Sequence, residues 1–187
     1  MSRRSAHSAA ARRALRLAVA AAAFAAWTAA AAPATAAFTA DDLQAAARTL
    51  QFLESLPRSG TLSVGLVYSG DAAGAAEAAR RFGALSAPNA TRFDVVTIAA
   101  VELERYSGHL DLLLLMPGTS ASAAAIAGTV RARHVASISS DPACLETHCC
   151  VLMVRSGERV DIVLDTALAD AAGARFSTVF TMMVKRK

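Results

Sequence analysis

Residues 110–116 read Leu-Asp-Leu-Leu-Leu-Leu-Met, a stretch that is apolar at all but one position. A strand covered on only one face alternates apolar and polar residues, whereas a strand buried on both faces is apolar throughout. Parallel sheets bury both faces because their crossover helices pack on each side. This stretch therefore predicts the central strand of a mostly parallel sheet.

Shorter apolar stretches with β-branched residues occur on either side of this segment and predict further strands. Three of them cover residues 61–69, 93–99 and 134–139. Two more, 150–155 and 159–164, are separated by the turn residues Ser156-Gly157-Glu158. This last pair predicts an antiparallel hairpin at one edge of the sheet.

Apolar residues recur at helical spacing between the predicted strands. The predicted helices cover residues 38–56, 71–85, 120–133 and 166–172, with a short helix at 101–106. Thr39 and Asp42 have the spacing of a capping box at the start of the first helix. Residues 176–184 fit both a helical and a strand pattern, and we favour the helix.

Strands that alternate with helices indicate an α/β fold. We expect three layers, with a mostly parallel sheet, helices on both faces and an antiparallel edge hairpin. No internal repeat or linker is visible after residue 37. Residues 38–187 are therefore expected to form one domain.

Small polar residues follow three of the predicted strands where the chain turns. The carboxyl ends of parallel strands meet at one edge of the sheet, which is where ligands bind in open α/β folds. Hydroxyl groups and the backbone N–H groups of helix starts suit an anion. The candidate ligand-binding residues are Ser69, Asp71, Thr119, Ser120 and Ser140. The same residue types also form ordinary turns and helix caps, so both interpretations stay open.

The chain has three cysteines, Cys144, Cys149 and Cys150. In an oxidising compartment two of them are expected to pair. The spacing favours a Cys144–Cys149 disulfide that closes a small ring, with Cys144–Cys150 as the alternative and a vicinal Cys149–Cys150 bond as the least favoured. The third thiol is either buried or available to a second chain, and burial is the simpler interpretation.

His148 beside two cysteines raises the alternative of a zinc or copper site. Neighbouring residues of a strand point to opposite faces, so Cys149 and Cys150 are poorly placed to share one metal. We expect neither a metal nor another cofactor. Catalytic motifs such as G-x-S-x-G, H-E-x-x-H, the P-loop and G-x-G-x-x-G are absent from the sequence, and we assign no catalytic residue.

Residues 1–37 have the layout of an export signal. Five arginines and no acidic residue precede or begin an apolar stretch over residues 17–32, and Ala34-Thr35-Ala36 matches an A-x-A cleavage pattern. The apolar stretch is short for a permanent membrane anchor. Arg12-Arg13 leaves the general and twin-arginine export routes open. The abundance of Ala and Arg over Lys indicates a bacterium, and hence the periplasm as the destination.

The basic character of the chain resides in this leader. The formal net charge is +4 over 187 residues, and the five leader arginines leave −1 on the remaining 150. A near-neutral body gives no electrostatic reason to expect a nucleic-acid partner. The high hydrophobic fraction, 55%, excludes a disordered chain.

Residues 137–184 carry a recognisable series of motifs: a strand ending in Ser, Cys144 in a short loop, Cys149 before a strand, Arg-Val-Asp-Ile-Val-Leu at 159–164, an Ala-rich helix ending in Ala-Gly, and a final apolar segment. This segment resembles the C-terminal half of the YfiR-like family of small periplasmic proteins and of related single-lobe, periplasmic-binding-protein-like sequences.

The resemblance implies an α/β domain without catalytic activity. Typical YfiR-like proteins dock on the periplasmic part of a membrane-bound diguanylate cyclase, often as dimers, with disulfides tuning their activity. The leading hypothesis is therefore an exported regulator that occupies the sensor part of a membrane signalling protein such as a diguanylate cyclase or a histidine kinase, with a homodimer possible. The alternative is a small-solute-binding component associated with a transporter.

Overall fold

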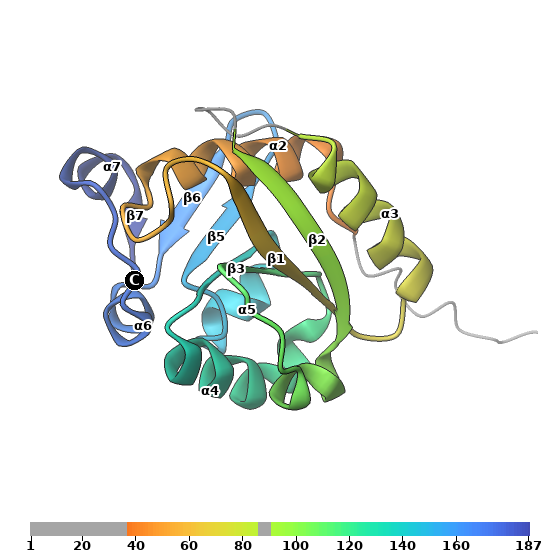
Figure 1. The fold of residues 1–187 in the computed structure, drawn as a ribbon. Coiled ribbons are helices and arrows are strands. Elements are labelled where there is room, and N and C mark those ends of the chain that lie inside the picture. Colours follow the sequence, from red (N-terminus) through yellow and green to blue (C-terminus); the bar gives the residue numbers. More distant parts are fainter. Residues whose placement is uncertain (1–36, 86–90) are drawn as a thin grey trace, which may run out of the picture. The chain divides into compact units, whose positions relative to one another are not determined.

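A single sheet organises the computed structural model, which describes residues 37–85 and 91–187 (Figure 1). The strand order is β2-β1-β3-β4-β5-β6-β7. The strands are β1 (Thr61–Tyr68), β2 (Arg92–Ala99), β3 (Leu112–Leu115), β4 (Ala136–Ser139), β5 (Leu152–Arg155), β6 (Asp161–Leu164) and β7 (Lys185–Arg186). Neighbours from β2 to β5 are parallel, β5 and β6 are antiparallel, and β7 runs parallel to β6. The predicted fold class is confirmed.

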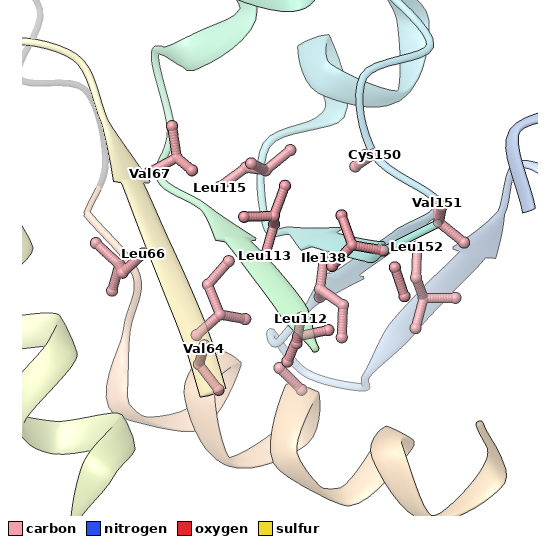
Figure 2. Close-up of a cluster of buried hydrophobic side chains, with 14 of the residues drawn as sticks. Val64, Leu66, Val67, Leu112, Leu113, Leu115, Ile138, Cys150, Val151 and Leu152 are labelled. Carbon is pink, nitrogen blue, oxygen red and sulfur yellow. The ribbon is translucent and has the colours of Figure 1, made fainter. Parts of the chain in front are cut away.

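The apolar stretch forms the centre of this sheet. All four leucines of β3 are completely buried, and the strand pairs with β1 on one side and β4 on the other. Figure 2 shows Leu112, Leu113 and Leu115 among side chains from these neighbours and from β5. A strand in this position has helices above and below it, which is why it carries no polar side chain.

Asp111 is the one polar residue of the predicted strand, and it lies just before β3 begins. Its backbone N–H donates to the carbonyl oxygen of Ser63 at 2.8 Å, and its carboxylate accepts from the Ser63 N–H at 2.8 Å. Asp111 therefore lies just before the start of β3, where its two hydrogen bonds to Ser63 help to fix the register between β1 and β3.

Helices cover both faces of the sheet. α2 (Ala40–Thr49) and α3 (Ala72–Gly83) contact each other on one face, and α4 (Ala123–Arg133) and α6 (Thr166–Ala172) contact each other on the other (Figure 1). The predicted capping box is present, because Thr39 accepts from the Asp42 N–H and Asp42 accepts from the Thr39 N–H, both at 3.0 Å. Phe38, directly before the cap, is buried.

Several connections differ from the sequence-based prediction. The first helix ends at Thr49 rather than continuing to residue 56, and η1 (Leu50–Phe52) follows it. The chain leaves the helix there because Leu53 forms an isolated bridge with Phe176. The short loop that the sequence predicts around Cys144 contains α5 (Pro142–Glu146), which Asp141 caps by accepting from the Ala143 N–H. The remaining short helices are η2 (Ala100–Arg105) and η3 (Thr119–Ser122).

Over residues 176–184 the chain forms the favoured helix and not the alternative strand. The favoured helix is present as α7 (Thr178–Met183), and the chain then forms β7 beside β6. The two residues of β7 place a short parallel strand outside the predicted edge hairpin. The predicted signal peptide, residues 1–37, lies outside the described residues except for its last residue. Among the described residues, no helix combines the length and the hydropathy needed to cross a membrane.

Candidate binding site

The loops that carry the predicted ligand-binding residues do meet at one edge of the sheet. β1, β3 and β4 are adjacent parallel strands, so the segments after them start side by side. The Met116 N–H donates to the Val67 carbonyl oxygen at 2.9 Å, which joins the first two segments. The Gly118 N–H donates to the Asp141 carboxylate at 3.1 Å, which joins the second and third.

Two of the five candidate residues, Asp71 and Thr119, have side-chain partners within the fold. Asp71 caps α3 and accepts from the Gly74 N–H at 2.8 Å, while Ser69 is exposed. Thr119 is buried and donates its hydroxyl to the Met116 carbonyl oxygen at 2.8 Å. Ser120 is half-buried and Ser140 is buried. At Asp71 and Thr119 the structure thus gives the capping and turn roles, and a ligand role for the five residues stays a prediction.

Asp141 organises this edge, although the sequence did not single it out as a site residue. One carboxylate oxygen accepts from Gly118 and the other from the Ala143 N–H at 3.0 Å. Its place directly before a proline is the signal of a helix cap that could have identified it. Asp141 therefore joins the segment after β3 to the start of α5.

The disulfide lies beside this edge, in the connection from β4 to β5. Cys144 and Cys149 are bonded, with their Cα atoms 5.2 Å apart, and both are buried. The favoured pairing is confirmed, and Cys150 is the free, buried thiol. Burial raises the pKa of the Cys150 thiol to about 12, and the nearby Asp165 and Asp141 charges act in the same direction. Cys150 is therefore a protonated core residue and not a nucleophile.

A histidine and a carboxylate pair next to the disulfide. His148 has a positive φ of 53°, and its Nδ1 lies 2.5 Å from the Asp165 carboxylate. Asp165 is buried and also caps α6, accepting from the Leu168 N–H at 2.9 Å. Within the described part of the chain, no hydroxyl or thiol hydrogen-bonds to this imidazole. The pair therefore lacks the nucleophile that a catalytic triad requires.

The same loop is tied to the last strand. The Lys187 side-chain amine donates to the Leu145 carbonyl oxygen at 2.8 Å and lies 3.5 Å from that of Glu146. The Lys187 N–H donates to Leu164 at 2.9 Å, which continues the pairing of β7 with β6. Lys187, the residue after β7, thus contacts α5 directly, although about 40 residues separate the two in sequence.

A partly apolar concavity lies elsewhere, between α2, the start of β6 and α7. We call it the α2–α7 groove. Its volume is about 510 Å³, and Phe52, Ile162, Phe180 and Val184 form its apolar lining. The rings of Phe52 and Phe180 stack with their centroids 5.0 Å apart. A volume of this size is within the range of sites that hold a drug-sized ligand or an inserted side chain.

Charged side chains surround this apolar lining. Arg48, Arg159 and Lys185 are cationic and Asp161 is anionic, so the groove lining has a formal net charge of +2. Lys185 pairs with Asp161 at 2.7 Å. Arg48 and Arg159 are exposed, and neither forms an ion pair with another described residue. Two guanidinium groups are therefore available to an incoming anion.

Exposed apolar side chains lie around the groove, and two of them, Val160 and Met183, are part of its lining. Val160, Val179, Met182 and Met183 are 52%, 62%, 76% and 64% exposed. Three of them belong to α7, and Val160 belongs to the turn before β6. Together they form what we call the α7 rim. The sequence analysis missed the groove and its rim because their residues come from three distant segments, and no local pattern brings them together.

Comparisons with known proteins reveal similarity of fold alone. No family model and no curated protein matches the chain. One similar structure is the ABC domain in complex with L-Trp from Streptococcus pneumonia, with a TM-score of 0.58, 12% identity and coverage of 78% of this chain and 61% of that chain. A conserved domain protein from Vibrio cholerae gives a TM-score of 0.54, 12% identity and coverage of 79% and 60%.

This chain therefore spans about 60% of the length of the structures that it resembles. The shared feature is the α/β architecture. The resemblance to the YfiR-like family is not confirmed by these comparisons.

Proposed function

We propose that this chain is an exported binding protein without catalytic activity that docks on the extracytoplasmic sensor part of a membrane signalling protein, such as a diguanylate cyclase or a histidine kinase. The observation that carries the proposal is the α2–α7 groove with its α7 rim. Water-exposed methionine and valine side chains grouped around a concave apolar surface are typical of protein–protein interfaces. Methionine is also common at surfaces that adapt to a partner.

The other polar features of the molecule support docking over catalysis. Asp71 and Thr119 at the carboxyl edge of the sheet are engaged in a cap and a turn, and no hydroxyl or thiol of the described residues hydrogen-bonds to the His148–Asp165 pair. The disulfide supports the export part of the proposal, because disulfides persist in oxidising compartments such as the periplasm. The signal-like leader points to the same destination.

Direct binding tests this function. The oxidised mature chain would be titrated by calorimetry into the purified extracytoplasmic domains of the diguanylate cyclases and histidine kinases encoded near its gene. We expect one of them to bind, and we expect Val179→Ser with Met182→Ser to weaken the complex at least about tenfold, since apolar anchors dominate interface energies. Both side chains are exposed, so the variant should fold normally.

Val101→Ser is the matched control, because Val101 is 83% exposed but lies on η2, away from the groove. It should bind as the unmodified chain does. Absence of binding to every sensor domain tested, with the chain folded and oxidised, would refute the proposal.

A second candidate function is a small-solute-binding component associated with a transporter. The likeness to a domain crystallised with L-Trp favours it, and its site would be the edge that carries Ser69, Asp71, Thr119, Ser120 and Ser140. Thermal unfolding with L-Trp and other amino acids is the test. A ligand present at about 100 times its Kd stabilises the folded state by about 2.7 kcal/mol, which raises Tm by several degrees. Unchanged Tm values with all of them would count against this candidate.

A further inference from the structure

The charge around the α2–α7 groove defines what kind of surface can enter it. Arg48 comes from α2 and Arg159 from the turn before β6, so the two unpaired guanidinium groups belong to different walls of an apolar groove. An occupant that buried only apolar side chains here would leave both cations beside a low-dielectric interface. An occupant with carboxylates beside its apolar side chains would satisfy both features.

Two occupants from this chain itself fit poorly. The leader, residues 1–37, has five arginines and no acidic residue, so it would add positive charge to a positive groove. A second copy docked symmetrically on the same face would place two linings of charge +2 against each other. Repulsion between positive charges therefore disfavours both the leader and a second copy as the occupant of the groove.

A small anionic ligand would occupy the groove but would leave part of the α7 rim uncovered. The groove could hold its body, but Val179 and Met182 on α7 do not line the groove and would stay exposed. A longer partner segment can fill the groove and cover the rim at once. An anionic membrane surface would meet the cations, yet a flat surface cannot fill a concavity of about 510 Å³.

We therefore propose that the α2–α7 groove receives an acidic, amphipathic segment of the partner protein, with an aromatic or long aliphatic side chain against the Phe52–Phe180 pair and carboxylates on Arg48 and Arg159. This inference rests on the proposed docking function and specifies the chemistry of the partner. Apolar burial supplies most of the affinity, and the two arginines select acidic segments and accelerate association.

The sequence offers a clean probe for this binding. Trp27 is the one tryptophan of the chain and lies in the leader, so the mature chain has none. A short synthetic peptide with one Trp, several Leu and several Glu at helical spacing therefore reports its own burial through its fluorescence. The same peptide with Lys in place of each Glu is the charge control.

We expect the acidic peptide to bind with a blue-shifted emission, and the basic peptide to bind at least about tenfold more weakly. Arg48→Glu with Arg159→Glu should reverse this preference. Arg105→Glu with Arg131→Glu changes the net charge equally on η2 and α4, and should leave binding unchanged. Circular dichroism verifies that both double variants are folded.

Three outcomes would overturn the inference: no fluorescence change with the acidic peptide, equal binding of both peptides, or equal effects of the two double variants. Vesicles of phosphatidylglycerol and phosphatidylcholine form a further arm. Vesicle binding that depends on Arg48 and Arg159, without peptide binding, would replace the proposed segment with a lipid surface.

The sensor-domain titration separates this inference from the function on which it rests. A sensor domain that binds the unmodified chain and the Arg48→Glu, Arg159→Glu variant equally would leave the docking function standing and refute the acidic segment. Failure of every sensor domain to bind, with the acidic peptide bound as expected, would refute the docking function instead.

Discussion

Asp165 is almost completely buried, and its two carboxylate oxygens have different partners. One accepts from the Leu168 N–H and caps α6, and the other lies 2.5 Å from His148 Nδ1. We expect Asp165→Ala to lower the free energy of unfolding by about 2 kcal/mol, because a cap and a buried hydrogen bond are both lost. Urea unfolding followed by circular dichroism measures this.

His148→Ala should cost less than about 1 kcal/mol, since the ring is 55% exposed. Asp170→Ala, an exposed carboxylate on the same helix, is the control and should be close to neutral. An Asp165 variant as stable as the Asp170 variant would contradict this account of the cap.

Cys150 gives a prediction about both reactivity and pH. Its pKa is raised from an ordinary value of 9.0 to about 12, so burial favours the protonated thiol in the folded state. The stability associated with this shift is complete below pH 9 and is lost as the pH rises toward 12. We expect iodoacetamide to leave the folded, oxidised protein unmodified and to add one adduct after unfolding. Rapid labelling of the folded protein would show that the thiol is accessible.

At the scale of residues, the sequence was informative wherever partners are close along the chain. The Thr39–Asp42 box and the Cys144–Cys149 ring both depend on spacings of a few residues, and both are present. The His148–Asp165 contact was not predicted, because it joins positions 17 apart and needs a left-handed backbone at His148.

At the scale of elements, Asp42 connects α2 to the β5–β6 hairpin. Besides its part in the capping box, its carboxylate accepts from the Ser156 N–H at 2.6 Å. This contact fixes one wall of the α2–α7 groove relative to another. We expect Asp42→Ala to destabilise the protein by about 2 kcal/mol and Thr39→Ala by about 1 kcal/mol, as measured by urea unfolding.

Asp41→Ala serves as the comparison, because Asp41 is exposed in the same helical turn. It removes only a favourable charge near the helix N-terminus, worth about 0.5 kcal/mol. Equal losses for Asp41 and Asp42 would mean that the contact with Ser156 contributes nothing.

The strands within the sheet were predictable because burial on both faces requires apolar and β-branched residues, which can be recognised in the sequence. β3 is apolar throughout, and the flanking strands have the β-branched residues expected of them. α5 and β7 were not predicted, since five and two residues give no period. Their existence depends on tertiary contacts, namely the Asp141 cap and the pairing with β6.

At the scale of the whole molecule, the proposed export predicts a shorter mature chain. Phe38 is buried and Thr39 caps α2, so the domain needs its residues from 38 onward. We expect periplasmic protein to begin at Ala37 or Phe38 when its N-terminus is sequenced. Its intact mass should show the loss of two hydrogens for one disulfide and one thiol that is alkylated only after unfolding. Full-length protein with three free thiols would refute both export and pairing.

The groove could not be predicted at this scale for a physical reason. Its charge is local, since the chain beyond residue 37 is nearly neutral, and its shape arises where α2, β6 and α7 meet. Overall composition does not reveal a local positive charge, because it sums over the whole chain. Sequence periodicity describes each wall of the groove separately and does not show that the walls meet.

The Lys187 contact with the disulfide loop connects the Cys144–Cys149 ring to the end of the chain, next to the proposed docking surface. The ring between Cys144 and Cys149 contains the carbonyl groups that accept from Lys187, and β7, which ends one residue before Lys187, contributes Lys185 to the groove. Reduction should cost about 2 kcal/mol, the value for so short a ring, without unfolding the sheet. We expect hydrogen exchange to quicken over residues 178–187 after reduction, while β3 stays protected. Faster exchange there would predict that reduction weakens the proposed docking, whereas unchanged exchange in that segment would show that the disulfide and the groove are independent.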